Sequence, residues 1–134
     1  MKAEKVIRDR LNTFAGVTAL VASRTYPLVL PQEPTYPAIT FSRISSQRIE
    51  GVYTDYGMAR VRIQITCWAL TYDSAKAVAE QVRIALERYG TAVSGTLIAG
   101  VTVYDIHMGS EADAYEPTLD AFASSVDFTV VHAE

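Results

Sequence analysis

The fold is decided by residues 59–90, ARVRIQITCWALTYDSAKAVAEQVRIALERYG, in which an alternating strand passes into a helix. Successive side chains of a strand point to opposite faces of a sheet, and here one set of alternate positions is apolar while the other is mostly polar. The apolar set is Val61, Ile63, Ile65 and Cys67, and the other set is Arg60, Arg62, Gln64, Thr66 and Trp68. This pattern predicts a β-sheet with one covered face.

The helix is predicted to begin after Thr71 and to end at Gly90. Threonine is a favoured N-cap residue, and Asp73 lies in the first turn, where a negative charge suits the helix dipole. An apolar stripe at helical spacing consists of Ala75, Val78, Ala79, Val82, Ala85, Leu86 and Tyr89. Its small alanines allow this helix to pack closely against the covered face of the sheet.

The N-terminal part is predicted to add one helix, a short helical turn and two extended segments. Residues 3–14 are amphipathic at helical spacing, and this helix is expected to end at Gly16, followed by a short helical turn after Thr18. The prolines of residues 26–31 favour an edge strand or a strap. Residues 38–44 form a strand, and the polar and aromatic residues 45–57 join it to the strand of Arg60 as a long hairpin with a projecting tip.

Two more strands are predicted near the C-terminus, over residues 101–106 and 121–131, with an acidic loop at residues 109–120 between them. The expected fold is therefore α+β. A single domain over residues 1–134 holds a mostly antiparallel or mixed sheet with helices on one face, in the order α-β-β-β-α-β-β.

Composition is that of an ordinary globular protein. The 134 residues are 49% hydrophobic and 20% charged, and the net charge of −3 does not resemble that of a dedicated nucleic-acid binder. Cys67 is the single cysteine and lies in the apolar set of its strand, so we expect a buried thiol. No segment resembles a signal peptide or a membrane span, and a soluble protein is expected.

No arrangement of residues predicts catalysis, a cofactor or a metal. His107 and His132 have no partner at metal-ligand spacing, and the phosphate-binding glycine loops and the nucleophile motif of hydrolases are missing from the sequence. Five acidic residues near the C-terminus do not have the spacing of a calcium loop, and we interpret them as solvated: Asp105, Glu111, Asp113, Glu116 and Asp120.

Two groups of residues are candidates for contacts with other molecules. Arg43 and Arg48 are expected beside Arg60 and Arg62, where the four arginines form either a basic strip for assembly or DNA or an ordinary solvated sheet face. At the predicted hairpin tip, exposed aromatic residues favour contact with another chain. The tip residues are Tyr53, Asp55 and Tyr56. Trp68 is expected to pack at the junction of strand and helix rather than to bind a partner.

Several segments, in this order and spacing, resemble the tail-completion or tail-terminator proteins of long-tailed bacteriophages and prophages. The N-terminal ones are RTYPLVLP at residues 24–31, YPAITF at residues 36–41 and RIS at residues 43–45. The central ones are ARVRIQI at residues 59–65, CWA at residues 67–69 and TY at residues 71–72. YEP at residues 115–117 and SVDFTV at residues 125–130 follow.

This resemblance implies a structural function without catalysis. Proteins of this kind cap the finished tail tube as a ring, commonly of six subunits, stop its polymerisation and join the tail to the head connector, or stopper, protein. The chain would be made in the bacterial cytoplasm and become part of the tail or neck of the virion. Contacts with neighbours are then expected from the hairpin and from the segment that holds Glu111, Asp113 and Glu116.

Two further hypotheses follow. DNA passes through such a ring, so Arg43, Arg60 and Arg62 are expected to face the lumen and to contact phosphates weakly and without sequence preference. The alternative to a tail protein is a stand-alone α+β ligand-binding module or small enzyme with a pocket at the covered edge of the sheet, since such sheets host many functions.

Overall fold

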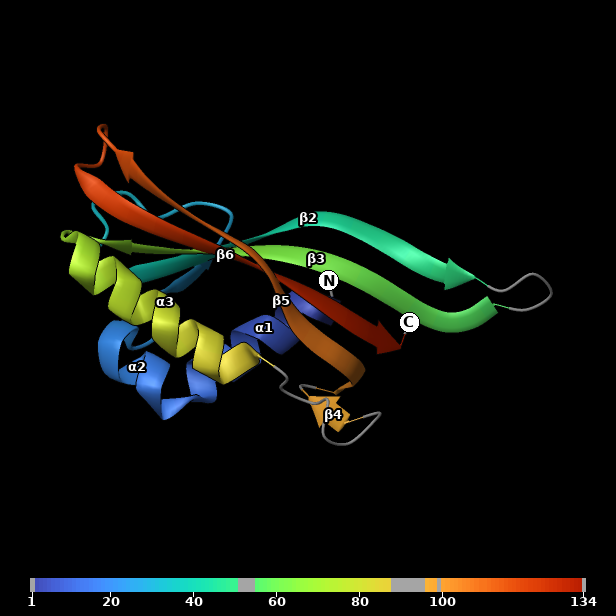
Figure 1. Ribbon diagram of the computed structural model, residues 1–134. Helices are drawn as coiled ribbons and strands as arrows, with labels where there is room; N and C mark the ends of the chain where they lie inside the picture. Colours follow the sequence, from blue (N-terminus) through green and yellow to red (C-terminus); the bar gives the residue numbers. More distant parts are fainter. Residues whose placement is uncertain (1, 51–54, 88–95, 99, 134) are drawn as a thin grey trace.

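The computed structural model describes residues 2–50, 55–87, 96–98 and 100–133 (Figure 1). The helices of this part are α1 (Lys2–Thr13), α2 (Ala15–Val21) and α3 (Tyr72–Leu86). The strands are β1 (Thr25–Pro27), β2 (Ala38–Glu50), β3 (Asp55–Ala69), β4 (Thr96–Ile98), β5 (Val101–Glu116) and β6 (Ala121–Ala133). They form one sheet in the order β1-β2-β3-β6-β5-β4, in which β1 is parallel to β2 and the other pairs are antiparallel.

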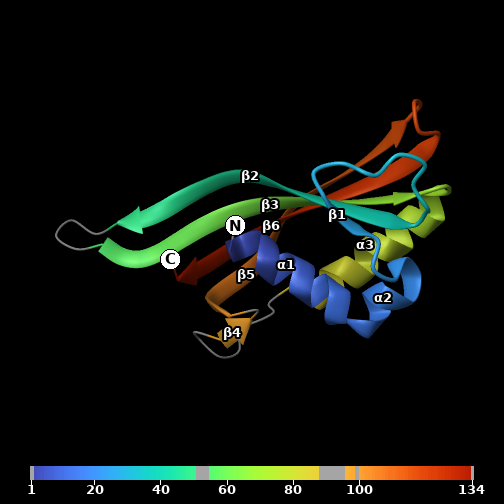
Figure 2. The same cartoon turned by 180° about the vertical axis from the view of Figure 1, so that it is seen from behind.

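The predicted α+β class is confirmed, with the helices on one face of a mostly antiparallel, mixed sheet (Figures 1 and 2). The alternation of β3 has the predicted consequence. Val61, Ile63, Ile65 and Cys67 are each at most 3% exposed and face the helices. Burying a side chain of this size contributes roughly 1.5–3 kcal/mol to folding, so this face of β3 is a main source of stability.

Helix α3 packs against the centre of the sheet. Its predicted stripe is buried through Leu86, whereas Tyr89 lies outside the described residues. Thr71 is the N-cap, as predicted, because its side chain accepts a hydrogen bond from the Ser74 N–H at 3.2 Å. Cys67 is buried, as predicted, and this burial raises the pKa of its thiol to about 12.

The long hairpin is confirmed as β2 and β3, and its far part extends beyond the helices (Figure 1). The register runs from Ala38 opposite Trp68 to Glu50 opposite Asp55, with a bulge at Ile44. Because a bulge adds one residue to one strand only, it shifts the later residues of β2 relative to β3. Arg48 follows the bulge and lies on the helix side because of this shift, whereas Arg43 precedes the bulge and shares the face of Ile39 and Phe41.

Three boundaries differ from the sequence prediction. Helix α1 ends at Thr13 instead of Gly16, because Phe14 adopts an extended backbone (φ −82°, ψ 118°) and α2 begins at Ala15. The turn predicted after Thr18 is therefore part of a complete short helix. Of the proline-rich extended segment, only Thr25–Pro27 forms a strand, and the predicted order also lacked β4.

The predicted acidic loop at residues 109–120 is wrong, since β5 continues to Glu116 and only residues 117–120 turn. Residues 111–116 pair one by one with β6, from Glu111 opposite Val126 to Glu116 opposite Ala121. Pairing with a buried strand satisfies those backbone groups of this polar segment that point toward β6, and the exposed side chains need no apolar partner. Asp120 closes the turn with positive φ (48°) and donates its N–H to the Pro117 oxygen at 3.3 Å.

Candidate assembly surface

The face of the sheet opposite the helices is polar and carries no helix in the described part of the chain (Figures 1 and 2). On β3, Arg60 and Arg62 are exposed, and Gln64, Thr66 and Trp68 are partly exposed. Partners in register from β2 and β6 continue this face with small polar side chains. They include Thr40, Ser42, Ser45 and Gln47 on β2 and Ser125, Asp127 and Thr129 on β6. We call this surface the open face.

Arg62 and Asp127 form the main ion pair of the open face. The Arg62 Nε donates to Asp127 Oδ2 at 3.0 Å, and a terminal guanidinium nitrogen donates to the same oxygen. Ser110 in the bulge of β5 also donates to this oxygen, at 3.1 Å. The side chain of Asp127 is 9% exposed and that of Arg62 is 49% exposed. One carboxylate therefore ties three strands together beneath an arginine that remains open to solvent.

Two further contacts between strands order the open face. The Trp68 Nε1 donates to the Thr40 hydroxyl at 3.0 Å, and the hydroxyls of Thr66 and Ser125 are 3.2 Å apart. Such cross-strand pairs stabilise a sheet and reduce the freedom of its side chains. Trp68 lies partly exposed on the open face and not toward the helices, and Thr40 is a specific hydrogen-bond partner that the sequence did not indicate. That Trp68 packs rather than binds a partner stays a prediction.

The four arginines do not share one face of the sheet, which both alternatives for them had assumed. Arg60 and Arg62 lie on the open face, but Arg43 is opposite Ile63 and Arg48 is opposite Ala59, both of which face the helices. Residues opposite each other share a face, so Arg43 and Arg48 lie on the helix side of the sheet. The Arg43 Nε is 3.3 Å from Glu4 Oε1 on α1.

The remaining hairpin candidates are only partly described. Tyr53 lies outside the described residues. Asp55 begins β3 opposite Glu50, and Tyr56 follows in the same strand. The hairpin itself is present, while the contribution of these side chains to assembly stays a prediction.

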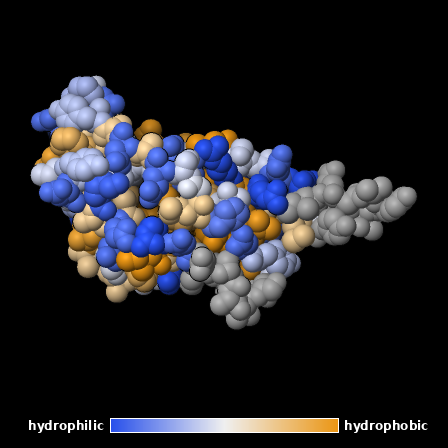
Figure 3. All heavy atoms as spheres, in the orientation of Figure 1, coloured by the Kyte–Doolittle hydropathy of each residue, from blue (hydrophilic) through white to orange (hydrophobic). Residues whose placement is uncertain are grey.

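The three acidic candidates are exposed or partly exposed along β5. Asp113 lies opposite Ser124 and points to the helix side, as does Glu111 opposite Val126. Glu116 ends the strand, where one of its carboxylate oxygens accepts the Thr118 N–H at 3.2 Å. The protruding β5–β6 turn is covered mostly by hydrophilic residues (Figure 3).

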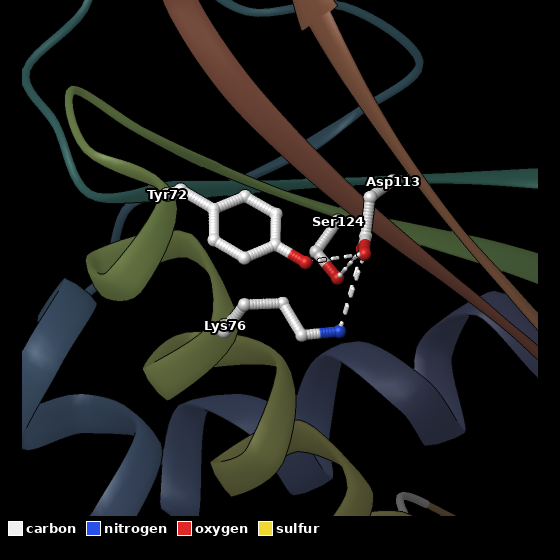
Figure 4. A network of polar contacts seen from close by, with 4 residues as sticks. All are labelled: Tyr72, Lys76, Asp113 and Ser124. Atoms are coloured by element: carbon white, nitrogen blue, oxygen red, sulfur yellow. Dashed lines mark hydrogen bonds and ion pairs between the residues drawn. The ribbon is translucent and has the colours of Figure 1, made fainter.

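Asp113 is the centre of a polar cluster that fastens α3 to the sheet (Figure 4). Its carboxylate accepts from the Tyr72 hydroxyl at 2.8 Å and from the Ser124 hydroxyl at 2.9 Å, and the Lys76 Nζ is 3.4 Å away. The hydrogen bond from Tyr72, followed by that from Ser124 and by the charge of Lys76, lowers the pKa of Asp113. The same hydrogen bond raises the pKa of Tyr72.

A pocket of about 430 Å³ lies on the helix side, where β1 leaves the edge of β2. Its lining is largely apolar at Pro27, Leu28 and Phe41. Lys5 and Arg8 of α1 and Arg43 of β2 add positive charge to the lining, and Glu4 adds one negative charge. Leu28 is 72% exposed beside it, with the positive φ of 65° that is unusual for this residue type.

Within the described residues, histidine, cysteine and acidic side chains do not form a group of three or more that could hold a metal ion. Among the described helices, none is long and apolar enough to cross a membrane.

Comparisons with known proteins agree with this geometry. The profile of the family described as "Tail completion protein gp17" matches residues 5–133. Among solved structures, a chain of the "Virion of native gene transfer agent (GTA) particle" matches with a TM-score of 0.77 and 14% sequence identity. The match covers 96% of this chain and 92% of that chain, and at this identity it shows a shared fold. No curated protein matches in sequence.

Proposed function

This chain belongs to the tail completion protein gp17 family, a family of structural proteins of phage-like virions, and we propose that it caps the finished tail tube as a ring of six subunits. The ring ends polymerisation of the tube and forms the tail side of the head–tail joint. The observation that carries the proposal is the family match over almost the whole chain, residues 5–133. A role in catalysis is not part of it.

The shape of the molecule supports this proposal. A head-to-tail ring needs two unlike, complementary patches on each subunit, and contacts above and below need further surfaces. The chain offers a polar open face, a helix-covered face and a hairpin that extends beyond the body (Figure 1). We assign the hairpin, with Arg48, Tyr53, Asp55 and Tyr56, to contacts with neighbouring subunits or the tail tube protein.

The open face is the surface that we assign to the lumen, where DNA passes. Arg60 and Arg62 lie there, whereas Arg43 is on the helix side and is no longer a candidate for this role. The phosphate contacts should be few and independent of sequence. Binding should weaken as the salt concentration rises, because the release of counterions from the DNA is then less favourable. Replacing both arginines by glutamine should flatten the salt dependence of DNA binding by the assembled ring. If the salt dependence of DNA binding did not change, the arginines would not be contacts for DNA in the lumen.

The main experiment tests tail completion directly. Deleting the gene should give overlong or headless tails, and supplying the intact gene in trans should restore normal ones. Purified protein mixed with purified tail tubes should form rings at one end of each tube in electron micrographs. Normal tails in the deletion strain would contradict the proposal, as would rings distributed along the tube walls. The same images would show whether a separate head–tail connector protein binds the capped end.

A further inference from the structure

Strands β2 and β5 are long, and each is covered only in part by the short strand at its outer side. At one edge, β1 pairs only with Ile39, Thr40 and Phe41, and the Leu28 N–H to Phe41 oxygen bond at 2.9 Å is the last between these segments. Beyond Phe41, no described strand lies beside β2 on that side (Figure 2). At the other edge, β4 pairs only with residues 101–103 of β5, and no other described strand pairs with β5 there. Such edges present backbone donors and acceptors to another chain.

The two edges have the directions that a repeating sheet requires. Between β2 and β5 lie three antiparallel steps, from β2 to β3, to β6 and to β5, so β2 and β5 run in opposite directions. A second copy placed side by side in the same orientation would bring its β5 antiparallel to β2 of the first. The helices of both copies would then lie on the same side of the joined sheet.

The side chains of the two edges carry opposite charges on the same side. Arg43 and Arg48 of β2 point to the helix side, and so do Glu111 and Asp113 of β5. Residues that face the same way on neighbouring strands interact, and opposite charges in such pairs are favourable. Like charges at either edge would disfavour the pairing of β2 with β2 or of β5 with β5. The charge pattern therefore selects unlike edges.

The pocket beside Arg43 gives this contact an apolar component. It opens on the helix side next to the edge of β2, between Phe41, Leu28 and the positive side chains of Lys5 and Arg8. An incoming β5 would direct Glu111, Asp113 and Tyr115 to this side, because their partners Val126, Ser124 and Phe122 lie on it. A strand with acidic and aromatic side chains matches an apolar pocket with a positive rim.

A closed ring also sets the offset between the edges. Arg43 is level with Met108 within one subunit, through the pairs with Ile63 and Phe128. Strands of a closed sheet tilt by about 35–45°, which at a spacing of about 4.8 Å offsets four successive strands by about 13–19 Å. An offset of about 14 Å corresponds to four residues along a strand and brings Arg43 level with Asp113.

We propose that residues 42–48 of β2 and residues 107–115 of β5 from a second copy pair as antiparallel strands, so that neighbouring subunits join edge to edge into one sheet. The inference rests on the proposed ring, because it states how the subunits of that ring meet. The open face then becomes a continuous inner surface, and the helices form the outer layer.

Mixtures of variants that each carry one added cysteine test this contact in tails assembled from the full-length protein. One chain carries Ser45→Cys on β2, and the other carries His107→Cys, Ala112→Cys or Ala114→Cys on β5. All four positions are exposed on the open-face side, while the native Cys67 is buried. A short bismaleimide should give a dimer band on a denaturing gel that requires both variants, strongest with Ala112→Cys. The matched control pairs Ser45→Cys with Ala77→Cys, an exposed position on α3.

Tail length, read in the same preparations, separates this inference from the proposed function. Capped tails with no more cross-linking at 107, 112 or 114 than in the Ala77 control would overturn the edge contact and leave tail completion intact. Cross-linked dimers on tubes that remain uncapped would support the contact and overturn the function. Capped tails with dimers support both, and the position that gives the strongest band measures the offset.

Discussion

Asp127 places a negative charge between strands on an otherwise exposed sheet face. Its carboxylate oxygen accepts hydrogen bonds from Arg62 and Ser110, and Gly109 passes so close that an added Cβ would come within 3.3 Å of the Asp127 Cβ. Such a contact leaves little room for a larger residue at position 109. The one-residue shift in register between Met108 and Glu111 is therefore tied to Asp127.

The substitution Asp127→Asn should destabilise the fold. Hydrogen bonds to charged groups contribute about 1.5–3 kcal/mol, and because Arg62 is half exposed we expect a loss at the lower end of this range. Urea unfolding of the purified protein measures it. Arg60→Gln is the matched control, an exposed arginine on the same face of β3, for which we expect a change within about 0.5 kcal/mol. Equal losses in the two variants would deny Asp127 this role.

Asp113 makes part of the stability depend on pH. Its pKa is lower in the folded protein than in the unfolded chain, mainly because the Tyr72 hydroxyl donates to the carboxylate. The contribution is therefore complete above the ordinary pKa of aspartate, near 4, and is lost as the pH falls through the folded pKa. The difference in unfolding free energy between wild type and Asp113→Asn should narrow from about pH 7 to about pH 3.

Tyr72→Phe removes only one donor of this cluster and is the control for its cause. Its unfolding free energy should fall less steeply with acid than that of the wild type, because the pKa of Asp113 moves back toward its ordinary value. Parallel pH profiles for the wild type and Tyr72→Phe would show that another group carries the acid sensitivity.

At the scale of single residues, the sequence predicted the alternation of side chains in β3 but not the face of the sheet on which every arginine lies. The positions of Arg60 and Arg62 followed from the unbroken period of two in β3. That of Arg48 did not, because the bulge at Ile44 before it is set by pairing with β3 and carries no glycine or proline as a local signal. Arg43 lies before the bulge and shares the face of Ile39 and Phe41, so its face follows the alternation of β2 itself. The ion pair of Arg62 with Asp127 depends on contact across sixty-five residues of sequence, which single-strand patterns do not contain.

Among the elements, α3 shows how a local signal fixes a boundary. Thr71 has an extended backbone (φ −127°, ψ 153°), and its hydroxyl accepts the Ser74 N–H. Residues with this geometry satisfy a donor of the first helical turn that otherwise has no partner within the helix. The predicted start of the helix was correct because this signal involves only three neighbouring residues.

Thr71→Ala should lower the unfolding free energy by about 1 kcal/mol, because it removes the capping oxygen. Thr71→Ser keeps the hydroxyl and should stay within a few tenths of the wild-type value. Thermal and urea unfolding followed by circular dichroism would measure both. A loss of the same size in the serine variant would assign the effect to the threonine methyl group instead of the cap.

Strand β5 shows where prediction of elements fails. Its second half, with four acidic or aromatic residues and Gly109 before them, has no alternation of apolar side chains and was expected to be a loop. It is a strand because β6 supplies partners for its backbone, from Val126 to Ala121. Helix α2 was underestimated for a related reason, since Val17 and Val21 are buried by contacts that form only in the tertiary structure.

At the scale of the whole molecule, the hairpin is separable from the core. The buried cluster of β3 begins at Ala59, and the distal ends of β2 and β3 extend beyond the helices (Figure 1). The sequence predicted this separation, because residues 45–57 lack an apolar set while residues 59–67 contain one. Which neighbour the hairpin meets depends on the assembly and is not contained in one chain.

Replacing residues 50–57 by Asn-Gly, a favoured two-residue turn between the paired residues Ile49 and Met58, should leave the fold intact. Because this change removes no member of the buried cluster, the midpoint of thermal unfolding should stay within a few degrees of the wild-type value, about what 1 kcal/mol shifts in a domain of this size. Capping of tail tubes, scored in electron micrographs, should be lost.

A control keeps the length of the hairpin and replaces residues 51–54 by a glycine and serine linker. If this variant caps tails and the shortened one does not, the length of the hairpin is what capping requires. If neither variant caps tails, the side chains at the tip are required. Normal capping by the shortened protein would contradict a role for the hairpin in tail completion.

In the strands of the sheet, the residues that stabilise the fold and the residues that form the open face occupy alternate positions. The side chains that hold the molecule together lie on the helix side of the sheet, and alternate residues of the same strands carry the polar surface. Substitutions at positions such as Arg60, Gln64 and Thr66 can therefore change the charge of that surface with little effect on the packing beneath it. The surface of the open face can therefore change over evolution while the core beneath it is kept.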